Sequence, residues 1–448
     1  MGELQMLSSP TGAPSELSDA SWGTLWEHEL VRERVHRYPD PSPINLGAES
    51  RMASFNPKVF IRPDGLKRIA NVHLIDLLEP WREYFAGREF VFPTDPGDEF
   101  PHNDLAKVLL TYDPDMPTEL MNGLYYIDEA ASDETLEWLL ERAAEEGIAI
   151  SPTAKPTTAD VAVQIHLARP GVLEARTVRA IAFNKSAFQY YPGRHGDGRE
   201  LPDVTETHLA HMTEIMNPWF DERLKGRGVR AFVFRREQKF WLVIRHGKAA
   251  VREGKHEEDG ESGAAFYRPQ KHDVLIYDAA LDLLGINAET KGERDVYRKT
   301  LGQLVFGRVN YFGEGDVFTL APIRTVGPDI LKCGDVDGVT RVRLLEVVRV
   351  IPGDPPQIDI RRSSHLYQSL GTHWQEALSR GKITSAKFGF LFEDSSRERG
   401  VHIRLDSARY DRDSDAERVE AWLRERGFFD INREMDVIDE DEPVLASA

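Results

Sequence analysis

The chain has 448 residues, of which 41% are hydrophobic and 9% aromatic, and a single one is cysteine. This composition excludes an intrinsically disordered chain and a fold held by internal disulfides. The formal net charge of −19 argues against nucleic-acid binding by the whole surface, which leaves only a local basic patch open for such a partner. No run of about 18 apolar residues occurs, which is the length that a membrane-spanning helix needs. The first residues also lack the pattern of a secretory signal, so we expect a cytoplasmic protein that does not bind membranes.

The first half of the chain is predicted to be mainly helical. Residues 1–20 are rich in Ser, Pro and Gly and predict a disordered leader. After them, apolar residues recur at helical spacing. The best-defined helix spans 133–146, where Gly147 is a suitable residue to end it. Another long helix is expected at about 206–224.

Strand patterns begin after Gly226. Two apolar runs at 229–234 and 240–244, joined by a polar stretch that includes residues 235–238, predict a β-hairpin. The charged, glycine-containing stretch 253–263 that follows predicts an exposed loop.

A second hairpin is expected with arms near 273–278 and 283–289, and a helix at about 293–306 follows it. The last part of the chain mixes short strands with helices. Together these patterns predict a multi-domain α+β protein with a helical N-terminal half, a central antiparallel β-hairpin region with a helix, and a mixed α/β C-terminal domain. The expected boundaries are 1–20 for the leader, 21–225 for the helical domain, 226–314 for the hairpin and helix core, 315–435 for the C-terminal domain and 436–448 for an acidic tail.

The second hairpin carries a candidate metal site. Asp273 begins one arm, and Glu289-Thr290-Lys291 ends the other. If the hairpin is centred near Leu281, Asp273 lies opposite Glu289, and both point to the same face as Lys291. This arrangement resembles the metal-dependent nucleases of the PD-(D/E)xK type. The resemblance implies that Asp273 and Glu289 hold Mg²⁺ and that Lys291 positions the attacking water. The alternative stays open that the hairpin is only structural.

Two histidine patterns offer other candidates. Arg245-His246-Gly247 follows a predicted strand and resembles the first motif of the histidine phosphatases. That resemblance implies a histidine that accepts the phosphoryl group and an arginine that binds the phosphate. His208 and His211 share one face of a predicted helix, as two metal ligands would, with Glu214 and His195 as candidates for a third ligand. In both cases a surface or turn residue without chemistry is the simpler interpretation.

Three further features carry no clear chemistry. The glycine-rich segment 190–198 does not match a phosphate-binding loop. Cys333 has no histidine near it in the sequence, which favours a structural role. Arginines of the C-terminal region alternate with Asp and Glu, and this mixed charge suits a partner protein better than DNA.

The absence of a strong catalytic motif leads to the first functional hypothesis. It is a non-enzymatic interaction or regulatory protein that binds a protein partner as a component of a bacterial multi-protein system, with no cofactor. The alternative is a Mg²⁺-dependent nuclease, in which Asp273, Glu289 and Lys291 are the catalytic residues and Asp273 and Glu289 hold the metal.

Overall fold

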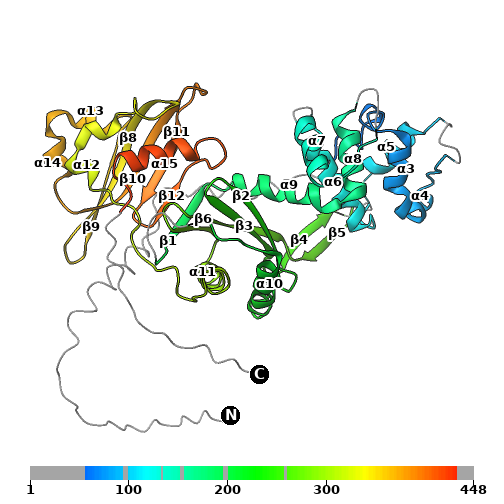
Figure 1. Ribbon diagram of the computed structural model, residues 1–448, viewed down its shortest axis with the longest axis horizontal. Helices are drawn as coiled ribbons and strands as arrows, with labels where there is room; N and C mark the ends of the chain where they lie inside the picture. Colours follow the sequence, from blue (N-terminus) through cyan, green and yellow to red (C-terminus); the bar gives the residue numbers. More distant parts are fainter. Residues whose placement is uncertain are drawn as a thin grey trace, which may run out of the picture. The chain divides into compact units, whose positions relative to one another are not determined.

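A computed structural model of the chain describes residues 56–93, 99–111, 113–132, 135–151, 156–194, 200–256 and 260–430. The predicted leader and acidic tail lie outside these ranges. Figure 1 shows helices in the first part of the described chain and a large antiparallel sheet with further helices in the rest, which confirms the α+β class. The described residues from Pro57 onward form one unit by their contacts, so the division into several domains stays a prediction. None of the described helices is both long and apolar enough to cross a membrane.

Short helices build the first part of the structure around one apolar core. The predicted helix at 133–146 is confirmed as α7, and Gly147 follows it with the left-handed φ of 64° that glycine favours. Asp160 is buried in α8, where its carboxylate accepts hydrogen bonds from the Ala70 amide and His73. The helices are α2 (Pro63–Leu66), α3 (Asn71–Leu78), η1 (Glu79–Trp81), α4 (Arg82–Gly87), α5 (His102–Leu110), α6 (Thr118–Ala130), α7 (Leu136–Glu145), α8 (Thr158–Ala168) and α9 (Pro170–Phe183).

A ten-stranded antiparallel sheet forms the rest of the core, in the order β2-β3-β6-β7-β1-β12-β11-β10-β8-β9. Strand β1 pairs with β7 on one side and β12 on the other. It therefore joins the strands of the predicted central and C-terminal domains, although it comes from the part predicted to be mainly helical. The strands are β1 (Ala187–Pro192), β2 (Arg230–Arg236), β3 (Lys239–Gly247), β6 (Gln270–Asp278), β7 (Leu283–Asn287), β8 (Val339–Ile351), β9 (Gln357–Arg362), β10 (Lys382–Phe392), β11 (Arg399–Arg404) and β12 (Ser407–Arg409).

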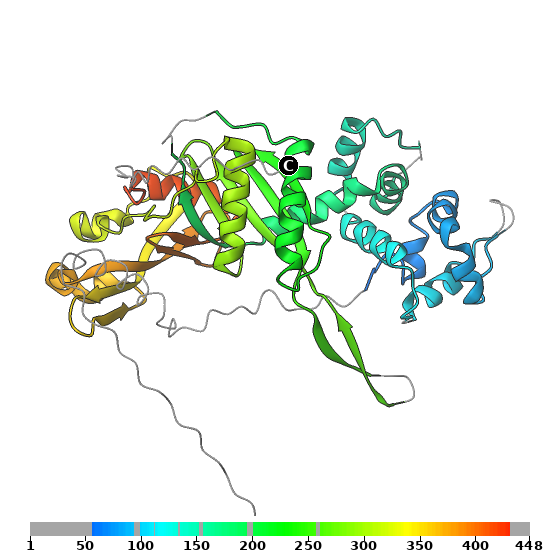
Figure 2. The ribbon, with the colours of Figure 1, turned by 90° about the horizontal axis from the view of Figure 1, so that it is seen from below.

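Side-chain alternation along β3 and β6 separates two apolar layers. Leu242 and Leu275 point to one face, which α10 (Glu206–Asp221) and α11 (Lys291–Phe306) cover side by side in Figure 2. Val243 points to the opposite face, where it packs with Val178 of α9. Any polar residue in the same alternation as Leu242 or Leu275 is thus buried beneath α10 and α11.

The C-terminal strands bury their apolar face beneath α15 (Ala416–Glu425), where Phe388 and Phe390 of β10 pack against Trp422. Shorter helices complete this region, and none of them contributes to the candidate site described below. They are α12 (Pro322–Thr325), η3 (Gly327–Leu331), α13 (Leu366–Leu370), η4 (Gly371–His373) and α14 (Trp374–Leu378).

Strands β4 (Val251–His256) and β5 (Ser262–Tyr267) follow β3 along the chain and precede β6. They form a separate two-stranded sheet. We call this hairpin the arm. The sequence predicts an exposed loop at 253–263, which is wrong for 253–256 and 262–263, because these residues pair into strands although they have no buried face. Figure 2 shows the arm projecting from the ten-stranded sheet, and the side chain of Phe266 on it is 77% exposed.

Candidate functional site

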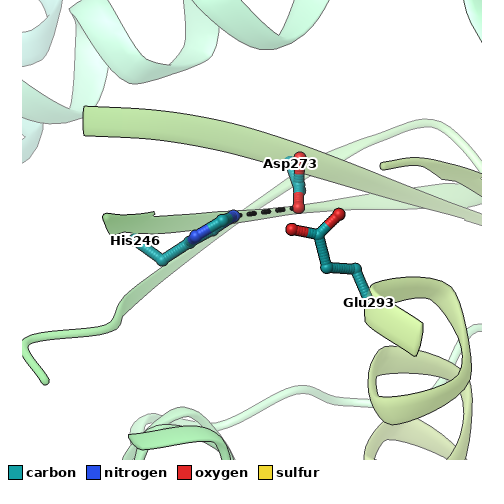
Figure 3. A group of neighbouring side chains, drawn as sticks. All are labelled: His246, Asp273 and Glu293. Atoms are coloured by element: carbon teal, nitrogen blue, oxygen red, sulfur yellow. Dashed lines mark hydrogen bonds and ion pairs between the residues drawn. The ribbon is translucent and has the colours of Figure 1, made fainter. Parts of the chain in front are cut away.

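A cluster of buried polar residues lies between the sheet and α11. His246 stands near the end of β3, directly opposite Lys271 of β6, and Asp273 lies two residues further along the same strand. The side chains of all three residues point to the same face of the sheet as Leu242 and Leu275, which α10 and α11 cover. Glu293, from the first turn of α11, completes the cluster by contacting Lys271. In Figure 3 the imidazole of His246 and the carboxylate of Glu293 approach Asp273 from different elements.

The start of α11 places Glu293. Thr290 is the N-cap residue, and its side-chain oxygen accepts a hydrogen bond from the Glu293 amide at 3.1 Å. The Glu293 carboxylate accepts one in return from the Thr290 amide at 2.9 Å. This reciprocal capping box directs the Glu293 carboxylate back over the start of the helix. Lys271 and Asp273 of the sheet lie next to the carboxylate there.

Asp273 is the centre of the hydrogen bonds. His246 Nε2 lies 3.0 Å from Asp273 Oδ2, and the Tyr297 hydroxyl donates to the same oxygen at 2.8 Å. The other ring nitrogen of His246 lies 2.8 Å from the Gly247 carbonyl oxygen. Burial and the Asp273 carboxylate hold the pKa of Tyr297 well above its usual value, so the phenol stays a donor. Both ring nitrogens of His246 therefore face acceptor oxygens inside the cluster.

Two lysines balance the two buried carboxylates. Lys271 Nζ lies 3.1 Å from Asp273 Oδ1 and 3.3 Å from Glu293 Oε2, and Lys225 Nζ lies 2.5 Å from Glu293 Oε1. Burial alone would lower the pKa of Lys271, but the carboxylates of Asp273 and Glu293 outweigh it and raise that pKa. Burial is likewise outweighed at Glu293, whose pKa falls to about 2 through its bonds with Lys225 and the Thr290 amide. The four charges cancel, as buried charges must if they are not to destabilise the fold.

Three of these residues also have the donor set of a metal site. His246, Asp273 and Glu293 each offer one ligand atom, and these atoms lie within 4.8 Å of one another. Two carboxylates and an imidazole suit Mn²⁺ or Zn²⁺ better than Mg²⁺, which prefers oxygen ligands alone. The Lys271 ammonium touches both carboxylates, so it supplies the positive charge that a metal would bring. A metal fits only if that ammonium moves aside.

The register of the second hairpin differs by one residue from the prediction. Val274 pairs with Asn287 and Asp278 with Leu283, so the position opposite Asp273 is 288 and not Glu289. The physical reason is the turn, in which the Asp278 carboxylate accepts hydrogen bonds from the Ala280 and Leu281 amides and thereby fixes a four-residue loop. A shift of one residue reverses the face of one arm.

The structure separates Lys291 from the other two residues proposed as catalytic. Asp273 is buried, whereas the side chain of Glu289 is 66% exposed. Both still contact one neighbour, since Lys271 Nζ lies 3.4 Å from Glu289 Oε2. Lys291 is the first residue of α11, and its ammonium lies 3.6 Å from Glu314 Oε1. The structure thus brings Asp273 and Glu289 together around Lys271 and turns Lys291 toward Glu314, while their catalytic role stays a prediction.

The remaining candidates fall in several places. Arg245-His246-Gly247 ends β3, which is antiparallel to both of its neighbours, unlike the parallel strand of the histidine phosphatases. His208 helps to cap α10 through Thr205, and His211 is exposed on the same helix. Burial raises the pKa of the Cys333 thiol, which does not favour a nucleophile. His195 and residues 195–198 of the glycine-rich segment lie outside the described residues.

Sequence reasoning missed the roles of Lys271, Glu293 and Lys225. One signal was present, because Thr290-x-x-Glu293 is the pattern of a capping box and would have started the helix earlier than 293. A second was the spacing of Lys271 and Asp273, which places both on one face of a strand. The ion pair between Lys225 and Glu293 joins residues far apart in the chain and had no local signal.

A cavity of about 770 Å³ lies beside the cluster. Helices α3, η1, α6, α8 and α9 form one of its walls. The other wall consists of the loop 225–228 and the adjoining ends of β2, β3 and β6. Lys225 and His246 line this cavity and also belong to the cluster, which therefore borders a space large enough for a small molecule.

Comparisons with known proteins name no relative: no model of a known protein family matches the chain, and no curated protein matches it significantly.

Proposed function

We propose that the chain is a non-enzymatic interaction or regulatory protein that binds a protein partner through the arm formed by β4 and β5. The observation that carries this proposal is the isolation of the arm. Its strands pair only with each other, outside the ten-stranded sheet. A two-stranded hairpin is marginally stable by itself in water, so an arm of this kind gains stability when a partner covers it.

One face of the arm carries an exposed aromatic residue. Phe266 lies opposite Arg252, and Gly254 lies opposite Ala264, so these four residues share a face. Small residues let a partner approach the backbone closely, and Phe266 offers a large apolar surface to bury. On the other face, the Tyr267 hydroxyl donates a hydrogen bond to Glu253 at 2.9 Å.

The buried cluster agrees with a role that needs no chemistry. Its carboxylates are paired with Lys225 and Lys271, and both nitrogens of His246 face protein oxygens. The cluster thus stabilises the junction of β3, β6 and α11 without needing a substrate to satisfy it.

A photo-crosslinking amino acid at position 266 tests the proposal in cells of the source organism. Position 91 is the control, since Val91 is 80% exposed but lies outside the arm. We expect a discrete crosslinked protein from position 266 and not from position 91. Absence of a crosslink at 266, or the same products from both positions, would contradict the proposal.

The ligand set of His246, Asp273 and Glu293 supports a second candidate, a metal-dependent nuclease. In this proposal Asp273 and Glu293 hold the cation with His246, and Lys271 moves aside to take the role expected of Lys291. A bound cation would activate water and stabilise the charge that develops on the phosphate.

Cleavage of DNA and RNA in the presence of Mg²⁺ or Mn²⁺ tests this second candidate. Asp273→Asn and Glu293→Gln should each abolish cleavage, while Lys291→Met should keep it. A purified chain that cleaves none of several single- and double-stranded substrates with either metal would rule the candidate out.

A further inference from the structure

We propose that the cavity between the helices and the sheet binds a small organic phosphate of the mononucleotide class. Its phosphate would contact the arginines of the sheet-side wall, and its planar base would pack on the aromatic residues of the helical wall. This site is separate from the arm, and the inference does not depend on the arm's function.

The sheet-side wall concentrates positive charge in an otherwise acidic chain. The lining residues of this wall include five cations and no carboxylate. The opposite wall contributes Asp76, Glu119 and Glu174. A cationic wall in a chain of net charge −19 is a local reversal of sign, which attracts an anion. The five cations are Lys225, Arg227, Arg230, Arg245 and Arg268.

Two of these arginines are placed as a like-charged pair. Arg230 of β2 lies directly opposite Arg245 of β3, an arrangement that destabilises a sheet unless an anion bridges it. Glu174 of α9 does so, since its Oε1 lies 3.1 Å from Arg230 and 2.6 Å from Arg245. The single negative charge of Glu174 balances only one of the two guanidinium groups, so the pair keeps a net charge of one. Phe232 holds both groups in place, with their central carbons 5.2 and 5.3 Å from its ring centre.

Arg268 adds a cation that has no partner in the part of the chain that the structure describes. Among the described residues it makes no ion pair or hydrogen bond, whereas Lys225 pairs with Glu293 and Arg227 with Asp221. Its guanidinium lies against Gly226, where a Cβ atom would be 3.3 Å from Nη1.

Backbone contacts fix the loop 225–228, which lies beside Arg268. Gly226 has the left-handed φ of 79°, which favours glycine. A Cβ atom on Gly247 would lie 2.4 Å from the Lys225 carbonyl oxygen, so the loop 225–228 packs directly against the end of β3. This close packing fixes the position from which Arg227 reaches the cavity.

The helical wall supplies aromatic side chains on which a nucleobase can stack. Trp81 and Tyr126 line it, and aromatic rings stack on nucleobases with little preference for one base. Arg245 of the opposite wall lies close to the Tyr126 hydroxyl. Asp76 and Glu119 stand on this wall as acceptors for the amino or imino groups of a base. The volume of about 770 Å³ lies within the range of about 300–1,000 Å³ that is usual for ligand pockets.

Titration calorimetry of the full chain tests the site with AMP, GMP, CMP and UMP as probes and adenosine as the probe without phosphate. We expect at least one mononucleotide to bind, and AMP to bind more tightly than adenosine. Arg268→Glu should weaken nucleotide binding by about tenfold or more, because it replaces a charge-assisted hydrogen bond with repulsion. Trp81→Ala should weaken nucleotides and adenosine alike.

The matched control is Arg397→Glu, which makes the same charge change at an exposed loop residue outside the cavity. It should leave nucleotide affinity unchanged, and thermal unfolding of each variant checks that the fold is intact. The inference is overturned if none of the four mononucleotides binds. It is also overturned if Arg268→Glu and Arg397→Glu have equal effects on the affinity.

Discussion

At the scale of single residues, the buried cluster shows how ionic groups can be kept inside a protein. Asp273 has three neighbours that donate to it or balance its charge, namely His246, Tyr297 and Lys271. Desolvating a carboxylate is costly, and only a full set of partners offsets that cost. Removing one partner should therefore be far more destabilising than the same change at the surface.

Lys271→Met tests this claim. The substitution leaves Asp273 and Glu293 with one ammonium between them, so we expect a loss of about 3 kcal/mol in the free energy of unfolding. Lys291→Met is the control, because the Lys291 side chain is 70% exposed, and it should change stability by less than about 0.5 kcal/mol. Urea denaturation measures both, and equal effects would show that the cluster does not need Lys271.

The pKa of Glu293 gives a prediction of pH dependence. Its folded pKa of about 2 lies below the value of 4.5 that an unperturbed glutamate has. A lowered pKa contributes stability above pH 4.5, and this contribution is lost as the pH falls toward 2. The stability difference between the wild type and Glu293→Gln should therefore shrink over this window. A difference that stays constant between pH 6 and pH 3 would contradict the ion pairs of Glu293.

At the scale of elements, the N-terminal turn of α11 links the helix to the site. Thr290 caps the helix and orients Glu293 at once, whereas the comparable cap of α10 pairs Thr205 with His208 on the surface. The capping box of α11 thus orients a buried carboxylate, whereas the capping box of α10 only stabilises the start of its helix.

Thr290→Ala and Thr205→Ala compare the two caps. Loss of an N-cap costs about 1 kcal/mol, and this is the expected effect at Thr205. At Thr290 we expect about 2 kcal/mol, near the upper end for such caps, because Glu293 also loses its orientation. Thr290→Ser should restore most of the loss. Equal losses at both positions, measured by thermal or urea unfolding, would argue that the cap and the cluster are independent.

At the scale of the whole molecule, β1 and a second buried network hold the sheet together. Lys239 of β3 pairs with Glu420 of α15, and Arg412 lies 3.3 Å from the same carboxylate. Arg412 also donates to the Tyr190 hydroxyl of β1 at 2.7 Å. Strands of the predicted central and C-terminal domains are therefore joined by backbone pairing and by charge.

Glu420→Gln should lower the free energy of unfolding by about 3 kcal/mol, since it leaves Lys239 and Arg412 without their shared anion. Glu417→Gln on the same helix is the control, because its side chain is 64% exposed. Both proteins should unfold in one transition over residues 187–409. Two separate transitions would instead support the predicted boundary near residue 314.

The sequence predicts the local features of this fold better than the distant ones. Helices such as α7 and α11 follow from apolar spacing and caps, which are properties of neighbouring residues. The position of β1 depends on partners about 100 and 220 residues away, and the arm has no buried face to give it a period. The candidate site follows the same rule. Asp273 was found from its hairpin, but Lys225 reaches Glu293 across 68 residues.

The central claim is that the arm binds a protein partner, and competition for the crosslink at position 266 tests it most directly. Excess unlabelled full chain should suppress that crosslink. A chain in which residues 251–267 are replaced by a short Gly-Ser turn should fold normally, because the arm lies outside the ten-stranded sheet, and should not compete. If the chain without the arm suppresses the crosslink as well as the full chain does, the partner binds elsewhere and the account is wrong.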